Sequence, residues 1–161
     1  MNGSMREVYE HILPMPITNL EFWIGQNVDD VDFSSYHRQI WVMGADIYYG
    51  TGYIPLLDDS GIPRIPPEHY VIYTVTSYPD CSSRTKHITR IGIMDPSIHL
   101  YGVSVNSSSD EINTAMLNNG FTEKEKTNST VTYVNGKYSI TFSDKYISLY
   151  VTVTNEHNLE F

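Results

Sequence analysis

The stretch from residue 146 to residue 154 constrains the fold more than any other part of the chain. Four aliphatic residues alternate there with five hydroxyl-bearing residues: Ile147, Leu149, Val151 and Val153 against Tyr146, Ser148, Tyr150, Thr152 and Thr154. A period of two places these two sets on opposite faces of an extended strand. One apolar and one polar face are typical of an antiparallel sheet that packs on one side only. We therefore expect a sheet with one buried face.

A short helix is predicted just before the C-terminal strands. Ser108 stands three residues before Glu111, a capping box that satisfies free backbone amides at the start of a helix. An apolar stripe with helical spacing follows at Ile112, Ala115 and Met116. Asn119-Gly120 ends the helix, because glycine adopts the left-handed conformation of a helix C-cap without strain.

Further strands and turns are indicated on both sides of this helix. Residues 69–78 alternate with period two, residues 87–94 indicate a further strand, and Asn135-Gly136 predicts a hairpin turn. Residues 58–68 contain three prolines and a turn sequence, which predicts a loop. Residues 27–40 carry apolar residues at helical spacing behind early aspartates, which favours a first helix.

The two halves of the chain follow a similar order. The segment "FWIGQNVDDVDFSSY" in the first half corresponds to "YGVSVNSSSDEINTAM" in the second, and predicted strands follow each of them. This order indicates two half-repeats, residues 19–95 and 96–155, within a single domain of residues 1–161. We expect an α+β fold: a mostly antiparallel, twisted sheet with one short helix in each half, built from two fused repeats.

The second half resembles a known type of unit. "YGVSVNSSSDEINTAMLNNGF", followed by three strands, is similar to the tandem helix-plus-meander unit of β-lactamase inhibitory protein and outer-membrane assembly lipoprotein E. The matching positions are Gly102, Ser108, Glu111 and Ile112, and the resemblance spans residues 98–154. It implies a non-enzymatic protein that binds other proteins across a sheet face.

The charge of the chain excludes some classes of partner. The net charge is −9, with only 10 Lys and Arg residues, so nucleic acid is not an expected partner. No apolar run approaches the length of a membrane-spanning helix. The single cysteine, Cys81, forms no disulfide within the chain and favours a reducing compartment. The acidity favours another protein, of basic character, as the partner.

Candidate chemical groups have simpler structural interpretations. Asp29, Asp30 and Asp32 lack the spacing of a calcium loop and suit the start of a helix. Cys81 lies in a turn-like stretch, outside the electropositive niche that a reactive thiolate needs. The histidines show no zinc spacing. We therefore expect no catalytic residue, no metal and no cofactor.

A group of aromatic residues is the predicted binding site. It comprises Trp23, Trp41, Tyr48, Tyr49 and Tyr53. Tyrosine and tryptophan on a sheet face anchor proteins or stack on sugars, because their rings are rigid and amphipathic. The alternative for the same residues is packing in the core.

The sequence leads to three functional hypotheses. The first is a non-enzymatic protein-binding module, such as an inhibitor or immunity-type protein that acts through a sheet face. The second is a carbohydrate- or small-ligand-binding module, and the third is an enzyme whose site is assembled from distant residues. If Met5 is the native start, we expect a cytoplasmic protein; if a leader has been removed, we expect an envelope or secreted one. The amino-acid sequence does not indicate an oligomeric state.

Overall fold

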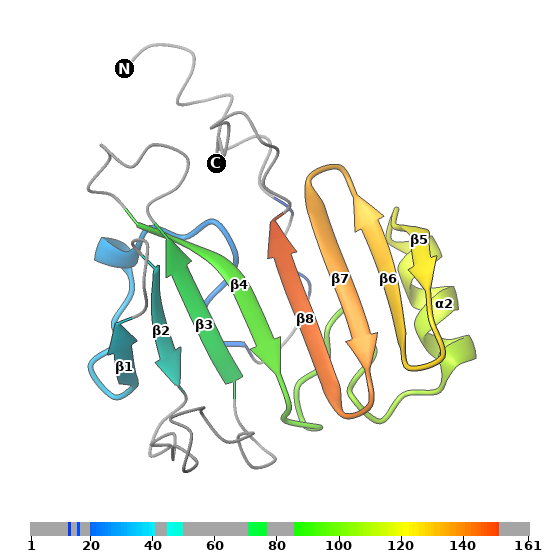
Figure 1. Cartoon of the computed structure of the whole chain (residues 1–161), viewed down its shortest axis with the longest axis horizontal. Coiled ribbons are helices and arrows are strands. Elements are labelled where there is room, and N and C mark those ends of the chain that lie inside the picture. Colours follow the sequence, from blue (N-terminus) through cyan, green and yellow to red (C-terminus); the bar gives the residue numbers. More distant parts are fainter. Residues whose placement is uncertain are drawn as a thin grey trace.

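In the computed structural model of this chain, the described residues form one continuous sheet of eight antiparallel strands (Figure 1). The structure describes residues 13, 16, 20–40, 45–49, 71–76 and 86–151. The strands of the first half are β1 (His37–Ile40), β2 (Ala45–Tyr49), β3 (Val71–Thr76) and β4 (His87–Ile93). Those of the second half are β5 (Thr122–Lys126), β6 (Thr130–Asn135), β7 (Tyr138–Ser143) and β8 (Tyr146–Val151).

The strand order is β1-β2-β3-β4-β8-β7-β6-β5, so each half contributes four consecutive strands and the halves meet at β4 and β8. Arg90 pairs with Tyr150 and Ile93 pairs with Ile147 at this junction. The antiparallel sheet predicted from the alternation is confirmed. On β8, Ile147, Leu149 and Val151 are buried as that alternation requires.

Helix α2 (Ser109–Asn118) forms where the capping box predicted it. The Ser108 side chain accepts a hydrogen bond from the Glu111 amide at 3.2 Å. Beyond the helix, Gly120 has a φ of +83°, and the Phe121 amide donates to the Met116 carbonyl at 3.0 Å. This is a Schellman ending, which only a residue that tolerates positive φ can supply cheaply. Both helix boundaries are therefore set by local sequence.

The prediction of one short helix in each half is wrong. Within the described part of the first half, residues 27–40 form only the three-residue 3-10 turn η1 (Val28–Asp30) and then strand β1. Asn27 accepts from the Asp29 amide and Asp32 accepts from the Ser34 amide. Such side-chain turns compete with helix formation at Asx residues. The described chain is therefore a mostly antiparallel sheet with one short α-helix, in place of two helix-plus-meander repeats.

Irregular chain replaces the missing helix as the cover of the first four strands. In Figure 1 the dark-blue beginning of the segment 20–36 passes behind the sheet and η1 lies at its β1 edge, while α2 lies behind β5 and β6. Phe22 packs edge-on against Tyr73 of β3, with ring centroids 5.4 Å apart. The backbone of this segment also pairs with the start of β4: the Ile88 amide donates to the Gln26 carbonyl at 2.9 Å. Large aromatic side chains here bury the apolar area that a helix would otherwise bury.

Candidate functional site

The residues of the predicted aromatic site do not form one exposed site among the described residues: some pack in the core, and others lie outside the described part of the chain. Trp23 is only 4% exposed, and its indole Nε1 donates to the Leu13 carbonyl at 2.8 Å. Tyr48 is half-buried and stacks on Phe33, with centroids 4.0 Å apart. Tyr49 follows it in β2, and Trp41 and Tyr53 lie outside the described residues. Trp23 and Tyr48 therefore both pack toward the helix side of the sheet.

Tyr48 belongs to a cluster of packed rings at the β3 end of the core: Phe22, Phe33, Tyr36, Tyr48 and Tyr73. Burial raises the pKa of Tyr73 to about 12, and its hydroxyl accepts a hydrogen bond from the Phe22 amide. The pKa of Tyr36 is also raised, by burial first and then by its hydrogen bond to Glu21. Both phenols therefore stay neutral at physiological pH, and the cluster is a packing unit.

The opposite face of the sheet is the stronger candidate, and we call it the hydroxyl face. By strand register its residues are Ile72 and Thr74 on β3, Arg90 and Gly92 on β4, Tyr146, Ser148 and Tyr150 on β8, Ser139, Thr141 and Ser143 on β7, and Thr130, Thr132 and Val134 on β6. In Figure 1 no described helix or segment crosses in front of these strands. Most of these side chains end in a hydroxyl group.

A row of contacts crosses the hydroxyl face from β6 to β4. Thr132 Oγ1 and Thr141 Oγ1 lie 2.8 Å apart, and Thr141 Oγ1 lies 3.5 Å from Tyr150 Oη. The guanidinium carbon of Arg90 lies 5.1 Å from the centre of the Tyr150 ring. Cross-strand hydroxyl pairs contribute only about 0.2–1 kcal/mol each. The row orders the side chains but leaves hydrogen-bonding capacity for a partner, since a hydroxyl can donate once and accept twice.

Gly92 leaves room for the side chain of Tyr146 on this face. A Cβ atom at Gly92 would lie 2.5 Å from Tyr146 Oη and 3.1 Å from two carbons of its ring. The phenol end of Tyr146 therefore rests directly against the β4 backbone, in space that any other residue would fill. Glycine within a strand often marks such a close approach. Tyr146 and Tyr150 present partly buried aromatic rings at the two ends of β8.

The hydroxyl face is nearly free of charge although the chain is strongly acidic. Arg90 is the one charged residue among those defined above, against a net charge of −9 for the whole chain. Glu125 pairs with Thr132 and therefore borders this face at the β5 edge, whereas Asp110 and Glu111 lie on α2. Keeping carboxylates away from the centre of a broad face suits contact with another surface, because unpaired charges are costly to desolvate.

Part of this face was visible in the sequence. The alternation of residues 146–154 places Tyr146, Ser148 and Tyr150 on the polar side of a strand, as the structure confirms. The sequence pattern did not predict that Arg90, Gly92 and Thr141 lie on this face. These residues join the face only through the register of β4 and β7 against β8, which no contiguous sequence pattern specifies.

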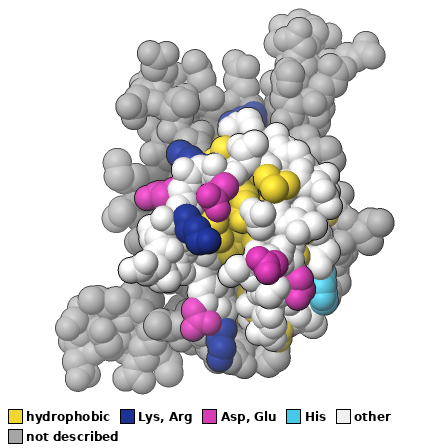
Figure 2. Space-filling model, turned by 90° about the vertical axis from the view of Figure 1, so that its right-hand side faces the viewer, with side chains coloured by type: hydrophobic (Ala, Val, Ile, Leu, Met, Phe, Trp, Pro, Cys, Tyr) yellow, Lys and Arg dark blue, Asp and Glu magenta, His cyan; other side chains and the backbone are white. Residues whose placement is uncertain are grey.

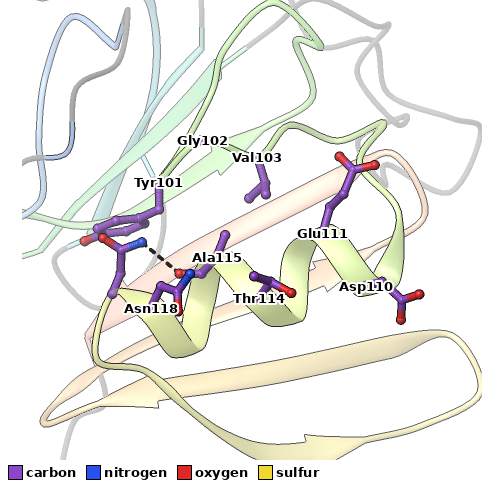
Figure 3. A pocket seen from close by; sticks show the side chains of 9 residues that line it. Tyr101, Gly102, Val103, Asp110, Glu111, Thr114, Ala115 and Asn118 are labelled. Carbon is purple, nitrogen blue, oxygen red and sulfur yellow. Dashed lines mark hydrogen bonds between the residues drawn. The ribbon is translucent and has the colours of Figure 1, made fainter.

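A groove lies beside α2 (Figure 3). It has a volume of about 580 Å³ and is lined by Tyr101, Gly102, Val103, Asp110, Glu111, Thr114, Ala115, Asn118 and Asn119. Tyr101 has a φ of +54°, and its buried hydroxyl oxygen has no hydrogen-bond partner among the described residues. However, the groove is wide open to solvent, and Glu111 already engages Ser108 at 3.1 Å. It offers few convergent polar groups to orient a ligand.

Within the described ranges, no three His, Cys, Asp or Glu residues lie close enough to share a metal ion. Asp32 accepts hydrogen bonds from Ser34, which lower the pKa of the Asp32 carboxyl. Asp29 and Asp30 occupy the first turn of η1. These aspartates therefore shape a turn. Cys81 lies outside the described residues.

No family model, curated protein or solved structure matches this chain. Among the described residues, no helix has both the length and the apolar character needed to cross a membrane.

Proposed function

We propose that this chain is a non-enzymatic binding module that recognises another protein through its hydroxyl face. The observation that carries the proposal is the composition of that face: tyrosine, serine and threonine side chains with one arginine, in a chain whose net charge is −9. Tyrosine supplies rigid contact area at low entropic cost, and serine and threonine supply adaptable hydrogen bonds. An inhibitor or immunity-type protein would use such a surface to cover its target.

The distribution of charge supports different roles in binding for the hydroxyl face and for the charged residues around it. Exposed Glu123 and Glu125 on β5, and Asp110 and Glu111 at the start of α2, lie away from the centre of the hydroxyl face. Rim charges chiefly set association rate and partner choice, whereas the buried centre of an interface sets the dissociation rate. The partner would therefore carry basic groups around a largely uncharged contact patch. The resemblance of residues 98–154 to units that bind proteins across a sheet face agrees with this proposal.

A second candidate function is the binding of a carbohydrate or another small hydroxylated ligand. The observation that favours it is the seating of Tyr146 against Gly92, close to the hydroxyl-bearing strands β7 and β8. An aromatic ring held beside hydrogen-bonding groups is suited to a sugar, which has both apolar and hydroxylated surfaces.

The test compares three forms of the chain as bait in extracts of the native host. These are the wild type, Thr141→Arg in the middle of the hydroxyl face, and Thr114→Arg on the exposed side of α2 as a matched control. We expect one specific protein to be retained by the wild type and by Thr114→Arg but not by Thr141→Arg. Direct titration of the purified protein should then give a defined stoichiometry.

Two results would overturn the proposal. One is the absence of any specific protein with the wild-type bait, and the other is equal retention by Thr141→Arg. Saturable binding on a glycan array that is lost in Tyr146→Ala would favour the second candidate function. Circular dichroism of each variant checks that the sheet is intact.

A further inference from the structure

Arg90 has an unusual position for a charged residue. It lies on β4, one of the two strands at the centre of the eight-stranded sheet, and its side chain is exposed on the hydroxyl face. No carboxylate of the described residues pairs with it, and its guanidinium carbon lies 5.1 Å from the centre of the Tyr150 ring. Among the described residues, Arg90 is therefore a cation at the centre of this face without an ionic partner.

The contact with Tyr150 positions the Arg90 guanidinium to bind an anionic group. A cation over an aromatic ring is held electrostatically by the ring, and a guanidinium held this way keeps its N–H donors around the rim of its own plane. Those donors match a carboxylate, which accepts two parallel hydrogen bonds from arginine. Tyr150 Oη lies 3.5 Å from Thr141 Oγ1, and the contact of Arg90 with the Tyr150 ring reduces the freedom that Arg90 would lose on binding.

On this basis, and resting on the proposed function, we propose that Arg90 and Tyr150 form a carboxylate-recognition point for an Asp or Glu side chain of the protein partner. The neighbouring hydroxyl group of Thr141, which is partly exposed, would lie beside the ion pair. The partner would thus place one acidic side chain at the centre of its contact patch.

The acidity of the chain as a whole does not oppose this local preference. The exposed glutamates of β5 are four strand positions away from β4, a separation of about 19 Å at ordinary strand spacing. Charges in physiological salt are largely screened beyond about 8–10 Å. A carboxylate in contact with Arg90 would therefore experience the guanidinium far more strongly than the glutamates at the sheet edge.

The experiment is an NMR titration of the full chain with N-acetylglutamate as the probe and N-acetylglutamine as the matched neutral probe. We expect saturable shifts at the Arg90 Nε–H and at the amides of residues 146–150 with the acid only. Lys124 and Lys126, which are exposed on β5, serve as the internal controls for non-specific ion pairing. Equal shifts at these lysines, equal shifts with the neutral probe, or no saturable shift at Arg90 would overturn the proposal.

Two substitutions separate this inference from the proposed function. Arg90→Gln removes the charge, and Arg90→Lys keeps the charge but not the planar donor fork. With a partner isolated by the Thr141→Arg comparison, we expect Arg90→Gln to weaken binding by about tenfold or more and Arg90→Lys to restore only part of it. A partner that is lost with Thr141→Arg but bound unchanged by Arg90→Gln would leave the proposed function standing and disprove the carboxylate-recognition point.

Discussion

At the scale of single residues, the hydroxyl face depends on one position without a side chain. Gly92 leaves the space that Tyr146 occupies, and the two residues come from different halves of the chain. The size of Gly92 therefore controls the orientation of a tyrosine that is distant in sequence. Arg90, two residues earlier, places a positive charge at the centre of the same face.

We predict that Gly92→Ala destabilises the protein by about 1–3 kcal/mol, because the new methyl group overlaps Tyr146 Oη. Urea unfolding measures this change. In the background of Tyr146→Ala the overlap is gone, so the same substitution should cost much less. Equal costs in the two backgrounds would show that the Gly92–Tyr146 contact does not carry the effect.

His87 gives the stability of the protein a pH dependence. Burial lowers the pKa of His87 below 6.5, and the nearby Asp30 carboxylate offsets this only in part. Unfolded His87 therefore binds a proton at a higher pH than folded His87 does, so protonation favours the unfolded chain. The stabilising contribution is complete above about pH 6.5 and declines as the pH falls below that value.

We accordingly predict that the melting temperature falls between pH 7.5 and pH 5.5, and that His87→Gln removes part of this fall. His99→Gln, at an exposed position, is the matched control for replacing a histidine elsewhere in the described chain. Thermal melts at several pH values test this. A profile for His87→Gln that runs parallel to the wild type would contradict the assignment.

At the scale of secondary-structure elements, strand β5 is a protected edge. It pairs on one side only, all five of its residues are exposed, and its register against β6 shifts between Glu123 and Glu125. Figure 2 views the molecule from this side and shows acidic and basic side chains interspersed around apolar surface. Charges and bulges on an edge strand discourage pairing with a second copy of the chain.

We predict that Lys124→Val combined with Glu125→Val promotes self-association, although the net charge stays the same. The two valines raise the strand propensity of β5 and remove charges that oppose the pairing of this edge strand with another chain. Sedimentation velocity over a concentration series measures the effect. Thr114→Val with Asn118→Val on α2 adds similar apolar area away from the edge, and association of that control to the same extent would contradict the edge explanation.

At the scale of the whole molecule, the pairing of β4 with β8 makes one sheet from two sets of four strands. Leu149 lies at this seam, opposite Ile91 on one side and Ile140 on the other, and has no exposed surface. Because the seam is both hydrogen-bonded and fully packed, we expect the halves to unfold together.

We predict that Leu149→Ala lowers the free energy of unfolding by about 2–5 kcal/mol through the cavity it leaves. Tryptophan fluorescence, which reports on the first half, and far-ultraviolet circular dichroism should still give the same urea midpoint. Two separate transitions, in the wild type or in Leu149→Ala, would show that the two halves of the sheet are energetically independent.

The sequence by itself determined the features that contiguous residues encode. The alternation at residues 146–154, the Ser108–Glu111 capping box and the Gly120 helix end each involve neighbours within a few positions, and each formed as predicted where the structure describes it. Periods of 2.0 and 3.6 residues report only which face a side chain takes within its own element.

The tertiary structure alone decided which elements meet. It placed β4 beside β8, brought Arg90 and Gly92 to the tyrosines of the hydroxyl face, buried Trp23, and covered the first strands with irregular chain where a helix was predicted. These outcomes depend on the competition among distant apolar segments to bury the same sheet surface. That competition is settled by packing and register between segments far apart in sequence, for which local propensity carries little information.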